Sequence, residues 1–225
     1  MRITEYQKLI NQHRNEFDTY YQELVSYNEK VNLTAITEVN EVFTKHFLDS
    51  ILSIDAIPMN SKIVDVGTGA GFPSLPIKIV RQDVDLTMVD SLNKRIIFLY
   101  MLCEKMKIKS NNVHARAEDF AKNNREKFDV AVARAVAKLN TLLEYLLPLV
   151  KVGGLVIAYK GANLAEEFMD AENALNVLGG KVLKSIRFDL PNGHGERHLL
   201  IIEKIKPTDK KYPRPQNKPK TDPIK

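Results

Sequence analysis

Two stretches near the start of the chain repeat apolar side chains at the three- to four-residue spacing of an α-helix. The first covers residues 3–27, and the second begins after Thr37, whose hydroxyl suits a helix cap, and continues to Ile54. Pro58 ends this pattern. We therefore expect a helical region over residues 1–57 that packs ahead of the rest of the chain.

Beyond Pro58 the pattern changes to short β-branched runs that alternate with longer amphipathic stretches. The predicted strands are 63–66, 85–89, 112–115, 128–133, 155–159, 181–190 and 197–204. Helices are predicted for a segment that ends near Val80 and for residues 92–107, 139–150 and 163–178. Strands that alternate with helices indicate a parallel sheet, whereas the last two strands are joined by a turn and should pair as a hairpin. The pattern predicts an α/β fold over residues 58–205, with a mostly parallel sheet and a terminal antiparallel hairpin.

Composition sets the class of protein. The chain of 225 residues is 44% hydrophobic and 27% charged, as in soluble globular proteins. It has no run of 18 apolar residues, and its first residues, Met1 to Glu5, are polar, so neither a membrane span nor a signal peptide is expected and the cytoplasm is the expected location. A single cysteine, Cys103, excludes an internal disulfide and a cysteine-cluster metal site. We expect no metal and infer no obligate protein partner.

The excess positive charge lies at the C-terminal end. The net charge is +5, and residues 206–225 contain seven Lys and Arg against two Asp, so residues 1–205 carry equal numbers of each sign. Five of the ten prolines lie in the same segment, which favours a flexible, extended arm over regular structure. A basic arm suggests a polyanionic partner, and a terminus that only keeps the protein soluble is the alternative.

The stretch Ile63–Pro73 reads IVDVGTGAGFP, a buried strand followed by three alternating glycines, Gly67, Gly69 and Gly71. Glycine is suited to such a turn because it accepts positive φ and lets a ligand approach the backbone. The amides at the start of the following helix would face that ligand. The next strand ends at Asp90, 19 residues beyond Gly71, about where an acid meets a ribose diol in nucleotide-binding α/β folds.

The glycine spacing distinguishes between two possible classes of cofactor. A dinucleotide fingerprint would place its third glycine at position 72, where this chain has Phe72. The run G-x-G-x-G, preceded by Asp65 and followed by a strand ending in acid, resembles motif I of the class I S-adenosylmethionine-dependent methyltransferases, whose Rossmann-like sheet also ends in a hairpin. A tight strand-to-helix turn without a ligand stays an alternative.

Further chemistry is expected where strands end at the same edge. Glu118 follows the third strand and could accept from an adenine amino group or simply cap a helix. Arg134 and Lys160 end buried strands, where a charge is more informative than on a helix face. His46 lies on the apolar side of its helix and is either a core histidine or a substrate contact.

Motifs that are missing from the chain argue against two classes of methyl acceptor. After the fourth strand it reads Ala133-Arg134-Ala135-Val136, unlike the Asn/Asp-Pro-Pro-aromatic motif of exocyclic amine methyltransferases, and Cys103 lies on the wrong helix for a pyrimidine C5 nucleophile. An acceptor that already bears a lone pair, such as guanine N7, needs no general base. Arg134 is the candidate catalytic residue, since it could bind the cofactor carboxylate, a phosphate or guanine O6.

At this point the chain resembles one family closely, the bacterial ribosomal RNA small subunit methyltransferase G family, also called glucose-inhibited division protein B. The resemblance covers nearly the whole chain and is carried by Tyr27–Thr34, His46–Ser50, the glycine turn, Val89–Arg95, Ala133–Ala135, Tyr159–Gly161 and Arg197–Leu199. It implies transfer of a methyl group from S-adenosylmethionine to guanine N7 of 16S ribosomal RNA, free or within the small subunit. The family's cofactor contacts carry over to Gly67, Phe72, Ala117, Glu118 and Arg134, whereas Gly69, Gly71 and Asp90 come from the geometric argument above.

For RNA contacts we expect His46, Lys160, Arg197, Lys211 and Arg214. The chain departs from the family's sequence after Lys211-Tyr212-Pro213-Arg214, where it continues Pro215-Gln216-Asn217-Lys218. Three other functions stay open: a nicotinamide-dependent oxidoreductase, disfavoured by Phe72, a non-catalytic RNA-binding or assembly protein, and a methyltransferase of small molecules.

Overall fold

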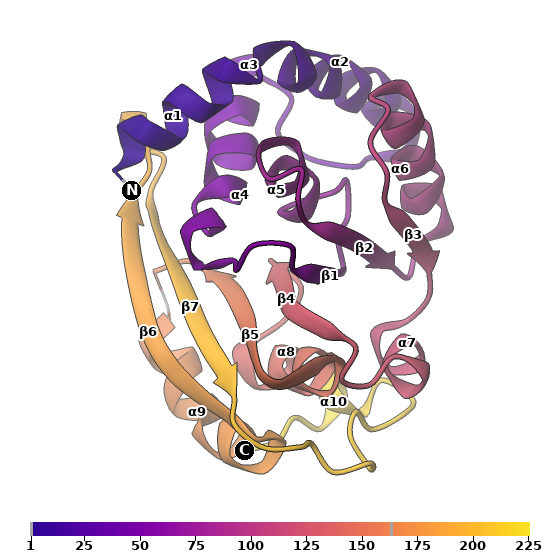
Figure 1. The fold of residues 1–225 in the computed structure, drawn as a ribbon, viewed down its shortest axis with the longest axis vertical. Helices are drawn as coiled ribbons and strands as arrows, with labels where there is room; N and C mark the ends of the chain where they lie inside the picture. Colours follow the sequence, from indigo (N-terminus) through magenta and orange to yellow (C-terminus); the bar gives the residue numbers. More distant parts are fainter. Residues whose placement is uncertain (1, 163) are drawn as a thin grey trace.

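The sheet expected from the sequence is present in the computed structural model, which describes residues 2–162 and 164–225 (Figure 1). Its strands lie in the order β3-β2-β1-β4-β5-β7-β6, and β7 alone runs in the direction opposite to the other six. The strands are β1 (Lys62–Val66), β2 (Asp85–Asp90), β3 (Asn111–His114), β4 (Phe128–Arg134), β5 (Val150–Lys160), β6 (Gly180–Asp189) and β7 (Glu196–Lys204). The predicted class, a seven-stranded, mostly parallel sheet with a terminal antiparallel hairpin, is confirmed.

Helices cover both faces of the sheet because successive residues of a strand point to opposite sides. Ile63 of β1 packs into the core shared with the N-terminal helices, while its neighbour Val64 packs into the core on the other face. The first face carries α5 (Ser74–Val80) and α6 (Asn93–Lys105), and the second carries α7 (Ala117–Asn123), α8 (Leu139–Leu146) and α9 (Leu164–Leu178) (Figure 1). Strands buried on both sides explain the continuous apolar runs in the sequence.

The N-terminal region is helical, but its first helix is divided. The predicted helix over residues 3–27 is two helices, α1 (Ile3–Gln12) and α2 (Arg14–Val31), which meet at a non-helical residue, His13. The apolar spacing continues across the break because both helices bury side chains in the same core, so the pattern could not reveal the change of direction. The helix predicted after Thr37 is likewise in pieces: α3 (Val39–Glu41), a π-helical segment (Val42–Leu48), α4 (Asp49–Ile51) and a 3₁₀ turn (Ile54–Ala56).

The expectation of an extended, flexible C-terminal arm is wrong. Residues 206–225 fold back along α8 and include a short helix, α10 (Lys218–Thr221) (Figure 1). The prolines do prevent long regular structure, but side chains of the domain take over the hydrogen bonding of the backbone. Thr141 of α8, for example, donates its hydroxyl to the carbonyl oxygen of Pro219 at 2.8 Å.

The helix predicted before the fifth strand ends early. The helix predicted over residues 139–150 ends at Leu146, is followed by a 3₁₀ turn over Leu147–Leu149, and gives way to β5 at Val150. Asn163, the predicted start of α9, lies outside the described residues.

Within residues 2–162 and 164–225, no helix combines the length and apolar character needed to cross a membrane.

Candidate functional site

The glycine turn between β1 and α5 is shaped by three positive φ angles, +74° at Gly67, +61° at Gly69 and +100° at Gly71. A Cβ atom at Gly71 would lie 2.6 Å from the hydroxyl oxygen of Tyr20, so this glycine is required by packing against α2. A Cβ atom at Gly69 would meet nothing within 4 Å. The backbone at Gly69 therefore borders open space, where a ligand can approach the main chain closely.

Asp65 supports the turn from beneath. Its side chain is fully buried, and its Oδ2 accepts a hydrogen bond from the Ser74 hydroxyl at 2.6 Å and from the Ser74 backbone N–H at 3.3 Å. Burial raises the pKa of Asp65 to about 7, although the hydrogen bonds from Ser74 and the charge of Arg134 oppose this. The first residue of α5 is thus tied to the strand that precedes the turn.

Two cavities meet at the carboxyl edge of the sheet and share Gly67, Val136 and Ala137 as lining residues. The smaller, of about 220 Å³, is here called the β2 cavity; the larger, of about 710 Å³, is called the β4 cavity. The lining of the β2 cavity includes Gly67, Asp90, Ala117, Glu118, Asn217 and Lys220. The lining of the β4 cavity includes Gly69, Phe72, His46, Asp49, Arg134, Lys160 and Arg197.

In the β2 cavity, two acidic side chains predicted from the sequence come together with the glycine turn. The Asp90 Oδ2 accepts from the backbone N–H of Gly69 at 2.9 Å and from the Arg95 Nη1 at 3.2 Å, so Asp90 also fixes the turn. Glu118 is only 5% exposed, and its Oε1 accepts from the backbone N–H of Asn217 at 3.3 Å. The tail residues Asn217 and Lys220 were missed by sequence reasoning, because the proline-rich composition argued against any fixed position for them.

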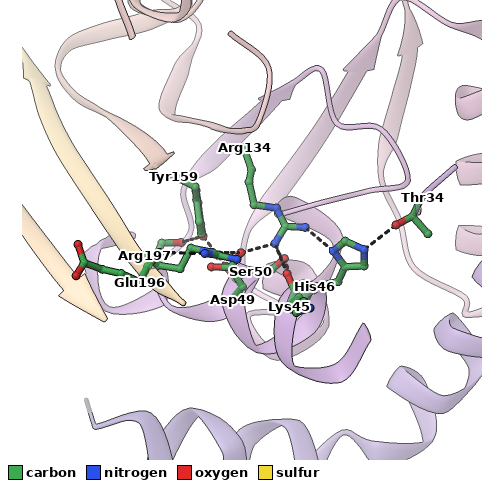
Figure 2. Close-up of polar contacts among 10 residues, drawn as sticks. Thr34, Lys45, His46, Asp49, Ser50, Arg134, Tyr159, Glu196 and Arg197 are labelled. Atoms are coloured by element: carbon green, nitrogen blue, oxygen red, sulfur yellow. Dashed lines mark hydrogen bonds and ion pairs between the residues drawn. The ribbon is translucent and has the colours of Figure 1, made fainter. Parts of the chain in front are cut away.

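In the β4 cavity, a buried carboxylate holds two arginines (Figure 2). The Asp49 Oδ2 accepts from the Arg134 Nη1 at 2.9 Å and from the Arg197 Nε at 3.3 Å. The Asp49 side chain is 2% exposed, and its Oδ1 has no hydrogen-bond partner among the described residues. Asp49 was not predicted, although it stands within the segment His46–Ser50 that carried part of the family resemblance.

His46 is held in one neutral form by its two neighbours. The Arg134 Nη2 lies 3.3 Å from the His46 Nδ1, and the His46 Nε2 lies 2.9 Å from the Thr34 hydroxyl (Figure 2). Arginine can only donate, so Nδ1 must accept and Nε2 must carry the proton. Burial, and then the charge of Arg134, lowers the pKa of His46 to about 3.

Phe72 joins the turn to this group through ring contacts. It stacks on His46 with a centroid distance of 4.5 Å and on Tyr20 with a centroid distance of 5.3 Å. The Arg134 guanidinium lies 5.1 Å from the centre of the same ring. The side chain where a dinucleotide fingerprint would have glycine therefore sets the position of His46 and Arg134.

The residues predicted to contact RNA are divided. His46, Lys160 and Arg197 line the β4 cavity. Lys160 is only 8% exposed, and its ammonium donates to the Glu167 Oε2 at 2.6 Å and to the Ala137 carbonyl oxygen at 2.8 Å.

Lys211 and Arg214 lie on the tail and line neither cavity. The Lys211 side chain is exposed. Arg214 donates from Nε and Nη2 to the carboxylate of the fully buried Glu144, at 2.9 and 2.8 Å. A buried partner fixes Arg214 within the protein rather than leaving it free for another molecule.

Solved structures with the same fold bind S-adenosylmethionine or are named methylases. One is the crystal structure of M. jannaschii TYW2 in complex with AdoMet, with a TM-score of 0.57 and 13% identity over 75% of this chain and 77% of that chain. Another is the ribosomal protein L11 methylase of Lactobacillus delbrueckii subsp. bulgaricus, with a TM-score of 0.56 and 18% identity over 72% of this chain and 79% of that chain. At these identities the likeness shows the fold alone.

Sequence comparisons are more specific. Residues 13–200 match the family model described as rRNA small subunit methyltransferase G. The protein of that name from Alkaliphilus oremlandii is 50% identical over 216 residues, covering 94% of this chain and 90% of its own length. The one from Lactococcus lactis subsp. cremoris (strain MG1363) is 47% identical over 224 residues, covering 97% of this chain and 94% of its own length. The chain therefore belongs to the rRNA small subunit methyltransferase G family.

Proposed function

We propose that the protein transfers a methyl group from S-adenosylmethionine to the N7 atom of a guanine in 16S ribosomal RNA. The observation that carries this proposal is the meeting, at Gly67, of the β2 cavity with its two acidic residues and the β4 cavity with its arginines. A nucleoside fits the first, and an anionic polymer can approach the second. Relatives named as ribosomal RNA methyltransferases over nearly the full chain supply the substrate class.

The residues around the glycine turn fit the cofactor. The open space at Gly69 accepts a ligand against the backbone, and Asp90 and Glu118 offer carboxylate oxygens to a ribose diol and an adenine amino group. S-adenosylmethionine supplies, when bound, a methyl group activated by its sulfonium. We assign the proposed cofactor contacts to Gly67, Gly69, Phe72, Asp90, Ala117, Glu118 and Arg134.

Gly71 has a different proposed part. It lines neither cavity and packs against Tyr20, whose hydroxyl donates to the carbonyl oxygen of Ala70 at 2.5 Å. We expect Gly71 to act on the cofactor only by fixing the path of the turn.

The side chains of the β4 cavity are suited to positioning rather than to proton transfer. Both nitrogens of His46 are engaged, one by Arg134 and one by Thr34, so His46 offers no free lone pair to act as a base. Guanine N7 needs no base, because its lone pair attacks directly. Holding the acceptor in line with the methyl carbon is then the main task of the protein. Arg134, fixed by Asp49, is the residue that we propose for this task and the candidate catalytic residue.

For RNA, we propose contacts from His46, Lys160 and Arg197 in the β4 cavity and from the exposed Lys211 on the tail. We propose that Arg214 holds the tail in place, since its guanidinium is paired with the carboxylate of Glu144. An RNA substrate of this kind supports a cytoplasmic location, which we propose. We also propose the division of the chain into a helical region (1–57), a methyltransferase domain (58–205) and a C-terminal segment (206–225).

Methyl transfer with labelled S-adenosylmethionine tests the function. Small subunits and free 16S RNA that lack the modification are offered as acceptors, and the product is cleaved with borohydride and aniline, which cut at 7-methylguanine. We expect label at a single guanine of the RNA, and cleavage of the RNA chain at that same guanine. Label at an exocyclic amine or a ribose, or no transfer to either acceptor, would overturn the proposal. RNA that already carries the modification serves as the control.

A further inference from the structure

The C-terminal segment, residues 206–225, reaches the β2 cavity and forms part of its wall. Asn217 and Lys220 line that cavity together with Asp90 and Glu118. We propose that this segment is a component of the cofactor site, and that its docking and the binding of the nucleoside half of the cofactor reinforce each other through Glu118. The inference rests on the cofactor placement proposed above.

The segment is held by partners buried in the domain. The carboxylate of Glu144 is 0% exposed and accepts from the Arg214 backbone N–H at 2.8 Å as well as from the Arg214 guanidinium. Arg125 donates from Nη2 to the Thr208 carbonyl oxygen at 2.6 Å, and Thr141 donates to the Pro219 carbonyl oxygen. A buried carboxylate that pairs with a bidentate arginine is costly to leave alone, so these contacts specify one position for the segment.

At the cavity, the contact between segment and domain uses the main chain. The backbone N–H of Asn217 donates to the Glu118 Oε1 at 3.3 Å. Asn217 has a φ of +60°, a left-handed conformation that Asn tolerates well. Glu118 has a second carboxylate oxygen, so one buried side chain can serve the tail and an adenine amino group at the same time.

This shared carboxylate couples the two events. When Asn217 is docked, it fixes the Glu118 side chain and closes one side of the cavity, so less conformational freedom is lost when the nucleoside binds. Linkage requires that the cofactor then stabilise the docked tail by the same factor. The cationic Lys220 adds a positive charge to a cavity whose other charged lining residues include Asp90, Glu118 and Arg116.

Limited proteolysis of the full chain tests the coupling without any variant. Trypsin cleavage after Lys211 or Lys220, neither of which precedes a proline, is followed by mass spectrometry with and without S-adenosylhomocysteine. Cleavage in this segment is expected to slow about tenfold with the ligand, with adenosine acting in the same direction at higher concentration and methionine having no effect. A cleavage rate in the segment that the ligand leaves unchanged would overturn the inference.

Calorimetry on two full-length variants tests the contact itself. Asn217→Pro removes the donor and cannot adopt the left-handed φ, whereas Asn217→Gly keeps the N–H and accepts that φ. We expect the Kd for S-adenosylhomocysteine to rise about tenfold in the first variant, or about 1.4 kcal/mol, and to stay within about twofold in the second. Equal affinities in both variants and the unaltered protein would overturn the inference, and so would equal losses in both variants. If the unaltered protein binds no S-adenosyl ligand, the proposed cofactor site itself fails.

Discussion

Arg134 donates a hydrogen bond to the Oδ2 of Asp49 at 2.9 Å, joining residues that are 85 positions apart. The contact links the end of β4 to the start of α4 in the N-terminal region. Arg197, from β7, donates to the same oxygen, so three parts of the chain meet at one carboxylate (Figure 2). The proposed acceptor side of the site therefore depends on how the N-terminal helices pack against the sheet.

Replacing that carboxylate should destabilise the fold. Asp49→Ala leaves Arg134, which is 12% exposed, without its ionic partner. We expect a loss of roughly 3 kcal/mol in the free energy of unfolding, measured by urea denaturation. Asp189→Ala, which removes an exposed partner of Arg187, is the control and should cost less than about 1 kcal/mol. Equal losses in the two variants would contradict a structural role for Asp49.

Substitution by alanine should have different effects at two glycines of the turn. Gly71→Ala places a Cβ 2.6 Å from the Tyr20 hydroxyl at a φ of +100°. It should lower the free energy of unfolding by roughly 2 to 4 kcal/mol. Gly69→Ala meets no atom within 4 Å, so it should cost only about 1 kcal/mol of stability while weakening cofactor binding. Urea denaturation and calorimetric titration measure the two effects, and a larger stability loss at Gly69 would contradict the assignment.

Asp65 should make stability fall as the pH rises. Its pKa is about 7 in the folded protein against 3.8 for the ordinary side chain, so the folded state holds more protons between these values. The stabilisation is complete below about pH 4 and is lost as the pH rises through 7. Relative to Asp65→Asn, the unaltered protein should lose roughly 2 kcal/mol between pH 5 and 8. Asp18→Asn, at an exposed helical ion pair, is the control, and a difference for Asp65→Asn that does not vary with pH would refute this account.

His46 should make stability fall as the pH falls, opposite to the effect of Asp65. It should add no ionisation to the pH–rate profile. With a pKa of about 3 against 6.5, it is neutral when folded but takes up a proton when unfolded at lower pH. The stability that it contributes is present above 6.5 and is lost as the pH falls toward 3. His46→Gln should reduce this loss between about pH 6.5 and 5.

Because His46 is already neutral at the working pH, its replacement should lower the rate of methyl transfer without moving any ionisation in the profile. Rates measured from about pH 5.5 to 8 check this. A step near pH 6.5 that disappears in His46→Gln would show that His46 titrates during the reaction.

Local patterns predicted the sheet, the glycine turn and the cluster of Gly67, Asp90 and Glu118, because strand ends of a parallel sheet meet at one edge. The break at His13 was not predictable, since the apolar spacing continues through it. The docking of Arg214 on Glu144 was also missed, because a buried partner 70 residues away overrides the local preference of a proline-rich segment. Asp49 was missed for a similar reason: its role depends on Arg134 and Arg197, which only the tertiary structure brings to it.

The structure of the protein bound to S-adenosylhomocysteine tests the central claim most directly. The account predicts the adenosine in the β2 cavity, between Asp90 and Glu118, with the amino-acid end passing Gly67 and Gly69 toward Arg134. A nucleoside bound elsewhere, such as the cavity of about 650 Å³ between α1 and β6, would contradict it.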